Sequence, residues 1–345
     1  MKTQTIKTQL ITHFLVFIAL GPLLVFQSCK RDSDTIEGPS LNDLYGDFAV
    51  LETLKVNQPE VDFSTGETVF FSARFSKLTD WTLTIKSNST SAVKIIQGKS
   101  RTIDQSSGLW DGSTTQFPSF GTGSCTAVLT VEADSSFSDS VSVSVTGSRV
   151  VEGRLVADFE NGINPDWNLF VQSGANMSFT IENSEVVPHG ANYFDMAGEV
   201  NWDYLIGLID FPATAYGANG FDLPSNPSDL YFNVVLYRPD TLTNGIVLFQ
   251  FKEDDNDDGN FTEANEDMYS LELKNLDAGW QIVSMKYSDM IALVNGSPSS
   301  PNGNGQHNPD KLHTLSCLFL ANPATGYSKA LMDFVIFTEG NPLSL

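Results

Sequence analysis

The 345-residue sequence is strongly acidic, with 42 Asp and Glu against 19 Lys and Arg and a formal net charge of −23 at pH 7. A surface with this charge repels nucleic acids and anionic polymers through its long-range field, so we expect no nucleic-acid partner. A ligand should be neutral, cationic or bridged by a divalent ion. The length exceeds what one hydrophobic core usually holds, which predicts two domains.

Residues 1–28 are predicted to be a signal peptide. Lys2 and Lys7 precede an apolar run from Ile11 to Phe26, and a run of about 16 residues is short for a membrane span, which needs about 20. The following segment, residues 29–46, is polar and rich in turn-forming residues, as is typical of a flexible tether.

The stretch "LLVFQSC" (23–29) resembles a bacterial lipoprotein signal. In such signals the cysteine becomes the lipidated first residue of the mature chain, and here that residue is Cys29. The resemblance implies attachment to a membrane through lipid. If Cys29 carries lipid, Cys125 and Cys317 remain, and each lies inside an apolar run, which predicts two buried thiols.

Residues 47–148 are predicted to form an all-β module. Short segments with period-two alternation are separated by Gly, Ser, Thr and Asp, a pattern typical of a β-sandwich. The expected strands are 67–75, 80–87, 125–133 and 140–147. The stretches "GETVFF" (66–71), "LWDG" (109–112) and "FGTGSCTAVLTV" (120–131) resemble extracellular Ig-like modules of the PKD and flagellar-hook-cap kinds, which implies a spacer or scaffold.

Residues 149–345 are predicted to form a second all-β module. Eight or nine strands with long connections favour a jelly-roll sandwich. The expected strands are 154–162, 176–183, 192–198, 230–237, 245–252, 268–274, 279–287, 313–322 and 330–340. The stretches "ADFENG" (157–162), "GWQIVSM" (279–285) and "MDFVIFTEGNP" (332–342) resemble galactose-binding-domain-like jelly rolls, carbohydrate-binding modules among them.

A lipid anchor, an Ig-like spacer and a C-terminal jelly roll together resemble the surface glycan-binding lipoproteins of bacterial polysaccharide-utilisation systems. The resemblance implies a non-catalytic protein at the surface of the outer membrane. It also implies a polysaccharide ligand, expected to be neutral because the chain is acidic, and neighbouring outer-membrane uptake proteins as partners.

The most acidic stretch is "EDDNDDGNFTEANED" (253–267), which carries eight carboxylates in fifteen positions. Asp254, Asn256, Asp258 and the Asn260 carbonyl match positions 1, 3, 5 and 7 of a calcium loop, with a glycine at position 6. Position 12 is an asparagine, where a calcium loop has a bidentate Glu, and Glu263, Glu266 and Asp267 are close enough to substitute if the hairpin folds back. We therefore predict a structural calcium at a hairpin tip; the alternative is a solvated acidic tip.

The jelly-roll resemblance implies a second calcium position. Jelly rolls of this type often bind a structural calcium where the first and last strands meet. Asp158, Glu160 and Asp333 are the acidic residues at the matching places. The alternative is that all three are surface carboxylates at strand ends.

Glycan binding requires aromatic faces that stack on sugar C–H groups, together with polar side chains for the hydroxyls. "NWDY" (201–204) offers both, with Trp202 and Tyr204 beside Asn201 and Asp203. Further candidates are Tyr193, Trp167 and Tyr216. Core packing is the alternative for any aromatic residue, and the alternating strands around Trp81 and Trp280 predict that role for both.

Enzyme motifs are missing from the sequence, which has no Gly-x-Ser-x-Gly elbow, no phosphate-binding glycine loop and no His-Glu-x-x-His. We therefore expect a non-catalytic protein. Two other hypotheses stay open at this point. One is an adhesin or scaffold with no sugar site, and the other is a glycosidase or lyase, whose two carboxylates need only be about 5–10 Å apart in space.

Overall fold

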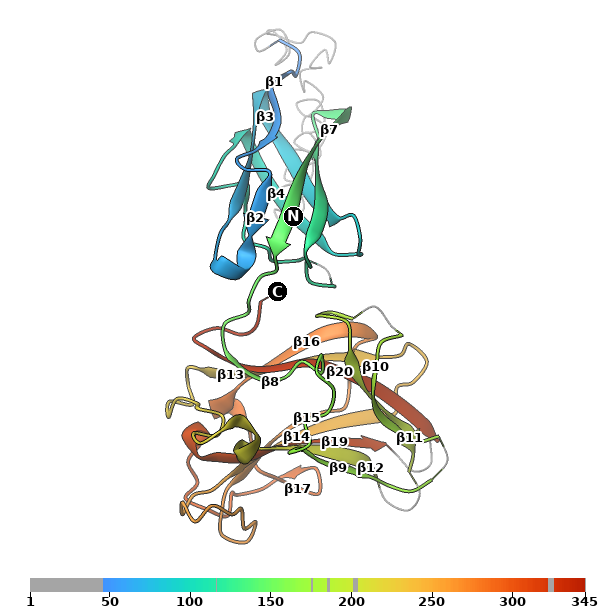
Figure 1. Cartoon of the computed structure of the whole chain (residues 1–345), viewed down its shortest axis with the longest axis vertical. Helices are drawn as coiled ribbons and strands as arrows, with labels where there is room; N and C mark the ends of the chain where they lie inside the picture. Colours follow the sequence, from blue (N-terminus) through green and yellow to red (C-terminus); the bar gives the residue numbers. More distant parts are fainter. Residues whose placement is uncertain are drawn as a thin grey trace, which may run out of the picture. The chain divides into compact units, whose positions relative to one another are not determined.

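The computed structural model describes residues 46–115, 117–174, 176–184, 187–200, 204–321 and 326–344 (Figure 1). The predicted signal peptide and Cys29 lie outside these residues. Residues Ala49–Leu345 form one compact unit, which contains all of the described strands. Among the described residues, no helix is both long enough and apolar enough to cross a membrane.

The described secondary structure consists of strands and four single turns of 3₁₀-helix. The turns are η1 (Phe63–Thr65), η2 (Ala213–Tyr216), η3 (Tyr287–Asp289) and η4 (Pro309–Lys311). The strands are β1 (Val50–Val56), β2 (Glu60–Asp62), β3 (Val69–Ser87), β4 (Val93–Ile103), β5 (Leu109–Trp110), β6 (Gly123–Val131), β7 (Asp134–Gly147), β8 (Arg154–Ala157), β9 (Asn168–Val171), β10 (Ser178–Glu182), β11 (Tyr193–Glu199), β12 (Leu205–Pro212), β13 (Leu230–Arg238), β14 (Gly245–Glu253), β15 (Met268–Leu273), β16 (Gly279–Lys286), β17 (Leu293–Val294), β18 (Ser297–Pro298), β19 (Leu312–Ala321) and β20 (Tyr327–Glu339).

The first seven strands form one sheet in the order β1-β3-β6-β7-β2, with β4 and β5 paired to β3. The 19-residue β3 is a single strand that covers both of the strands predicted at 67–75 and 80–87. Its pairing with β4 shifts register between Arg74 and Thr79, and the strand continues through this irregularity. Trp81 is 3% exposed in this strand, which confirms its predicted core role.

The remaining strands form a β-sandwich. Its six-stranded sheet has the order β10-β11-β20-β13-β16 with β8 beside β20, and its five-stranded sheet has the order β15-β14-β19-β12-β9. Figure 1 shows these two sheets as layers. Strands β17 and β18 form a separate hairpin. The all-β prediction is therefore confirmed, whereas the domain boundaries and the Ig-like and jelly-roll assignments stay predictions.

One hydrophobic core fills the space between the two sheets of the sandwich. Phe232 of β13 is completely buried there. Its ring lies 4.8 Å from the Phe249 ring and 5.0 Å from the Phe251 ring, and both of these belong to the facing sheet. Cys317 is buried in the same core, and Cys125 is buried in the seven-stranded sheet; both are free thiols, as predicted.

Truncation of Phe232 is expected to destabilise the sandwich strongly. Phe232→Ala removes a fully buried ring that contacts both sheets, and such truncations lower the free energy of unfolding by about 3–5 kcal/mol. Denaturant unfolding followed by tryptophan fluorescence measures the change. The matched control is Phe170→Ala, because Phe170 is 48% exposed and exposed substitutions change stability by about 0.5 kcal/mol or less.

Candidate functional site

The acidic stretch joins β14 to β15, which pair in antiparallel register from Val247↔Leu273 to Lys252↔Met268. The predicted hairpin is thus confirmed. Side chains alternate between the two faces of a strand. Phe249 and Phe251 point into the core, and two residues beyond Phe251 the same alternation places the completely buried Glu253 on the inner side.

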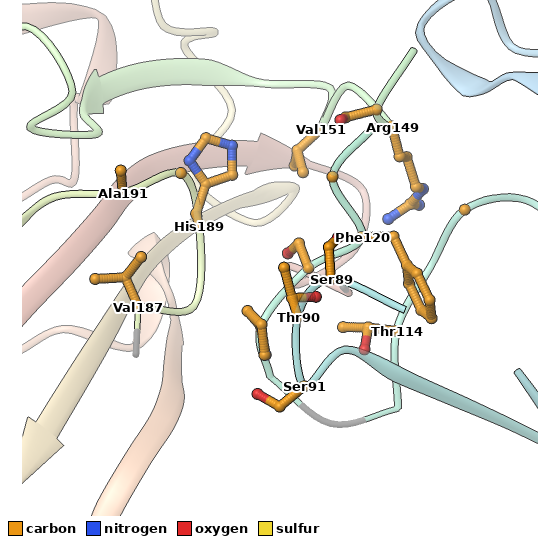
Figure 2. A pocket seen from close by; sticks show the side chains of 16 residues that line it. Ser89, Thr90, Ser91, Thr114, Phe120, Arg149, Val151, Val187, His189 and Ala191 are labelled. Atoms are coloured by element: carbon orange, nitrogen blue, oxygen red, sulfur yellow. The ribbon is translucent and has the colours of Figure 1, made fainter. Parts of the chain in front are cut away.

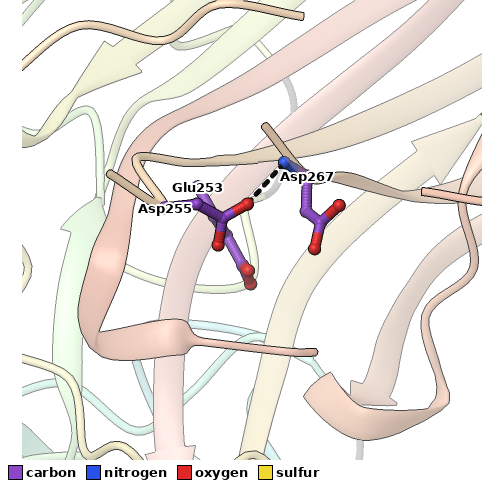
Figure 3. A group of neighbouring side chains, drawn as sticks. All are labelled: Glu253, Asp255 and Asp267. Carbon is purple, nitrogen blue, oxygen red and sulfur yellow. Dashed lines mark hydrogen bonds between the residues drawn. The ribbon is translucent and has the colours of Figure 1, made fainter. Parts of the chain in front are cut away.

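Three carboxylates meet at the base of this loop. Glu253, Asp255 and Asp267 each offer an oxygen, and the three oxygens lie within 4.8 Å of one another. Figure 3 shows the side chains converging, with the Asp267 amide donating to the Asp255 carboxylate over 2.9 Å. Glu253 and Asp267 are both 0% exposed. We refer to these three residues as the acidic triad.

Backbone amides of the segment 303–308 donate to the acidic triad. The Asn308 amide donates to both Glu253 oxygens over 3.0 Å. The Gly303 and Gly305 amides donate to the two oxygens of Asp267. The Tyr287 hydroxyl also donates to Glu253, over 2.8 Å. The triad therefore holds the segment 303–308 in place by satisfying its amides.

Three carboxylates this close together, of which Glu253 and Asp267 are buried and Asp255 is half-buried, repel one another unless a proton or a cation joins them. Burial raises the pKa of Glu253 to about 8, and the nearby charges of Asp255 and Asp267 act in the same direction. Hard carboxylate oxygens are the ligands that calcium prefers. The donor set therefore fits a calcium ion, with a proton on Glu253 as the alternative form of neutralisation.

The loop residues predicted to bind calcium, Asp254, Asn256, Asp258, Asn260 and Glu266, are not members of the triad. Asp254 accepts hydrogen bonds from the Asp258 and Gly259 amides, and Asp258 accepts one from the Asn260 amide. Asn256 accepts a second bond from the Asp258 amide. These side chains thus stabilise the turn itself. Glu266 is 1% exposed and accepts a hydrogen bond from the Thr262 amide.

The sequence prediction missed Glu253 and Asp255, whereas it named Asp267 as a possible substitute ligand. Its calcium-loop pattern selected the even-numbered side chains of the loop. Strand alternation gives the signal that could have found the triad, because Glu253 continues the inward positions of β14. Asp267 lies two residues before Tyr269 and four before Leu271, which both point into the core, so the same alternation places Asp267 on the inner side.

At the second predicted calcium position, Asp158 and Glu160 are near enough to Asp333 to affect its pKa, but among the described residues only the acidic triad brings three carboxylate oxygens within 4.8 Å of one another. Asp333 of β20 is completely buried, and burial raises its pKa well above the usual range, with Glu160 and Asp158 adding to the effect. The His189 amide donates to Asp333 over 3.1 Å, and the Ala191 amide donates to Glu160 over 2.9 Å. Asp333 is therefore no surface carboxylate, and a cation beside it would relieve the repulsion.

The aromatic candidates divide by burial. Tyr204 is 56% exposed, immediately before β12, whereas Asn201, Trp202 and Asp203 lie outside the described residues. Tyr193 is 1% exposed. Tyr193 is thus a core residue and cannot stack on a sugar, because its ring is covered by protein.

Two further aromatic candidates pack inside the sandwich. Trp167 is half-buried, with its ring edge-on to Phe211 at 4.9 Å. The hydroxyl of Tyr216 donates to the Val156 carbonyl over 3.0 Å. Trp280, predicted to be a core residue, is half-buried against Tyr237 at 5.3 Å.

The outer face of the five-stranded sheet carries an apolar row that crosses the strands. Leu248, Leu318, Leu208 and Phe170 occupy one register line on β14, β19, β12 and β9. The three leucines are half-buried, and Phe170 is exposed. The inward neighbours of these residues fill the core, so this row faces away from the six-stranded sheet. A parallel line contains Ile246, Leu320 and Leu205.

A polar row runs beside the apolar one. Gln250, Ser316, Asp210 and Asn168 occupy the next outward register line on the same four strands. The Ser316 hydroxyl donates to Asp210, and the Lys252 ammonium lies 3.8 Å from the same carboxylate. We refer to the two rows together as the ligand-binding face, a name that expresses our proposal for their role. It combines a band of apolar contact with a band of hydrogen-bonding groups.

A large cavity lies elsewhere in the molecule (Figure 2). Its volume is about 800 Å³, and its lining comes from residues 89–91, 112, 114, 118–121, 148, 149, 151, 187 and 189–191. Phe120 lines it but is 2% exposed. Burial lowers the pKa of His189, and Arg149 donates to the Ser344 carbonyl. This cavity offers neither an exposed aromatic face nor a carboxylate cluster.

Comparison with known proteins identifies similar structures but no family. No protein-family model matches the chain, and no curated protein matches it. The chain is similar in structure to carbohydrate-binding modules. One is the family 11 carbohydrate-binding module from Clostridium thermocellum in complex with a β-1,3-1,4-mixed-linked tetrasaccharide, with 13% identity, a TM-score of 0.36, and coverage of 55% of this chain and 98% of that one.

A second similar structure is SGBP-B from a complex xyloglucan utilization locus in Bacteroides uniformis, with 16% identity, a TM-score of 0.34, and coverage of 85% of this chain and 73% of that one. A third is the CBM22-1 xylan-binding domain from Paenibacillus barcinonensis, with 11% identity, a TM-score of 0.32, and coverage of 56% and 98%. Similarities of this size say nothing about the ligand of the present chain.

Calcium is expected to raise the unfolding midpoint, because an ion that binds only the folded state stabilises it by about 2.7 kcal/mol at a hundred times its dissociation constant. Differential scanning fluorimetry in calcium and in chelator measures the shift. Asp267→Asn should remove it, and Asp258→Asn should retain it. Loss of the shift in Asp258→Asn alone would assign the ion to the loop, and loss in Asp333→Asn alone to the β8–β20 junction.

Gly303→Ala is expected to destabilise the protein. A Cβ at this position would lie 2.0 Å from Asp255 Oδ2 and 2.8 Å from the Asp267 nitrogen, and overpacking of this kind costs about 1–3 kcal/mol. Equilibrium unfolding measures the loss. Gly121→Ala is the matched control, because a Cβ there would meet no atom within 4 Å; equal effects of the two substitutions would contradict the close approach.

Proposed function

We propose that this chain is a non-catalytic protein that binds a neutral polysaccharide on the ligand-binding face. The observation that supports this function most directly is the pair of neighbouring rows on the five-stranded sheet. Phe170 ends the apolar row with a ring that is 48% exposed. Exposed apolar surface beside fixed polar groups is the usual composition of a ligand site.

The spacing of the rows suits a chain of sugars. Neighbouring strands are about 4.8 Å apart, so a ligand lying across them meets one apolar side chain at each strand. Gln250, Asp210 and Asn168 offer polar groups beside it on β14, β12 and β9, whereas Ser316 of β19 is completely buried. Sugar rings have both kinds of surface, with C–H faces for Leu208 and Phe170 and hydroxyls for Asp210 and Asn168.

Tyr204, which is exposed, lies immediately before β12. Leu205, the next residue, pairs with Leu320 on the same outer face. Trp202, which remains a predicted platform, precedes Leu205 by three positions. Tyr204 is therefore a candidate contact at the margin of the glycan site, and Asn201, Trp202 and Asp203, which lie outside the described residues, remain predicted binding residues.

The carboxylates of the face argue against a glycosidase. On the outward register positions of β12, β14, β15 and β19, the acidic residues are Asp210 and Glu272. They lie on strands separated by three inter-strand spacings, about 14 Å, whereas a catalytic pair is about 5–10 Å apart. Each is also paired with a lysine, Lys252 or Lys274.

The wider setting of this function is also a proposal. Lipidation at Cys29 would hold the protein at the surface of the outer membrane, with residues 29–46 as a tether. A calcium ion at the acidic hairpin, at Asp158, Glu160 and Asp333, or at both would have a structural role. Outer-membrane uptake proteins would receive the captured polysaccharide.

Isothermal titration calorimetry against β-glucans, xylans, mannans and galactans tests the proposal. We expect at least one to bind with a dissociation constant between about 1 mM and 1 μM. Tyr204→Ala, Phe170→Ala and Trp202→Ala should each weaken binding about tenfold, since an aromatic contact contributes about 1 kcal/mol beyond its buried area.

Leu78→Ala is the control variant, because Leu78 is exposed but belongs to β3 of the seven-stranded sheet. Its affinity should equal that of the unaltered protein. If no glycan in the panel releases heat on titration, the proposal is refuted, and an adhesin or scaffold is favoured. Release of reducing sugar during long incubation would favour an enzyme.

A further inference from the structure

The ligand-binding face ends differently at its two sides. At one side it ends at β9, the edge strand that carries Phe170. At the other side it ends at β15, where the outward partner of Leu248 is the charged Glu272. The apolar row therefore runs from an exposed ring to a carboxylate.

The β17–β18 hairpin stands at the β15 side. The Ser270 amide of β15 donates to the Ile291 carbonyl over 2.8 Å, which attaches the chain just before β17 to the free edge of that strand. Asn295 and Gly296 form the turn, with φ of 51° and 72°, as is usual for a tight Asn-Gly hairpin. The position of this hairpin is thus fixed by the sheet.

The tip of the hairpin lies above the outer face of the sheet. A Cβ on Gly296 would lie 3.4 Å from Glu272 Oε1 and 3.8 Å from the Lys274 ammonium. Glu272 points outward, because Tyr269 and Leu271 point into the core. The turn therefore reaches the level of the side-chain ends. Figure 1 agrees, with β17 drawn on the side of the five-stranded sheet that faces away from the six-stranded sheet.

The side chains at this end are suited to contact a ligand. Glu272 is paired with Lys274 at 2.8 Å, which fixes the direction of its carboxylate. The second Glu272 oxygen, Oε1, is the atom nearest to Gly296. Val294 of the hairpin is 56% exposed. The end of the face thus provides a fixed hydrogen-bond acceptor beside an apolar side chain.

We infer that the β17–β18 hairpin closes the ligand-binding face at Glu272, so that the protein binds one end of a glycan chain and not its interior. This inference rests on the proposed function. A chain lying along the apolar row can extend past Phe170, whereas the hairpin stops it at β15. The face spans four inter-strand spacings, about 19 Å, and Glu272 accepts hydroxyls of the terminal sugar.

Stoichiometry measured against chain length tests the inference. The full chain is titrated with size-fractionated mixed-linkage β-glucan, xylan and mannan, from oligosaccharides to long polymers. Capture of a chain end predicts one protein bound per glycan chain at every length. A number of bound proteins that rises with length would overturn chain-end capture and leave the proposed function intact. Absence of binding to every fraction would overturn both.

End-blocked oligosaccharides and two variants give an independent measurement. A bulky aryl group on the recognised end should abolish binding, and the same group on the other end should leave it unchanged. Glu272→Gln keeps the shape of the side chain and should weaken oligosaccharide binding about tenfold, the effect of a lost charged hydrogen bond. Glu263→Gln, a change in the exposed part of the acidic loop, is the matched control. Binding that tolerates a block at either end would overturn the inference.

Discussion

The contact of Phe232 with Phe249 and Phe251 holds the two sheets of the sandwich together. Because side chains alternate along a strand, this contact also decides which side chains of β14 point inward. Once these rings point inward, the position of every neighbour on β13 and β14 is decided. Leu248 and Gln250 must face solvent. Glu253, although charged, must enter the interior. The hydrophobic core thereby determines both the outer rows and the buried carboxylate.

Much of the fold could be predicted from the sequence, because alternation is a local property. The strands of the sandwich around Phe249, Leu271 and Cys317 were expected close to where they lie. Strands β1, β4, β9 and β12 were missed, since their residues are partly exposed or interrupted and show weak alternation. The sequence pattern predicted two separate strands where β3 continues through a shift of register between Arg74 and Thr79.

The candidate site was harder to predict, since it depends on which strands are neighbours. The apolar row requires the register of β9, β12, β19 and β14, and no motif records that register. The acidic stretch was recognised, but the calcium-loop pattern selected Asp254 and Asp258 where the fold brings Glu253 and Asp267 together. Asp158, Glu160 and Asp333 were assigned to one position by resemblance, and they do share one electrostatic environment. Tyr193 is buried and Tyr204 is exposed, and the amino-acid composition around them does not show this difference.

The hydrogen bonds from the segment 303–308 to the acidic triad have a consequence for local stability. Gly303 and Gly305 lie outside the described strands, so their amides depend on Asp267 and not on a partner strand. Local opening can have a much lower free energy than global unfolding. Any change that loosens the triad would therefore make this segment the first to exchange its amide hydrogens and to be cut by a protease, while the aromatic core stays folded.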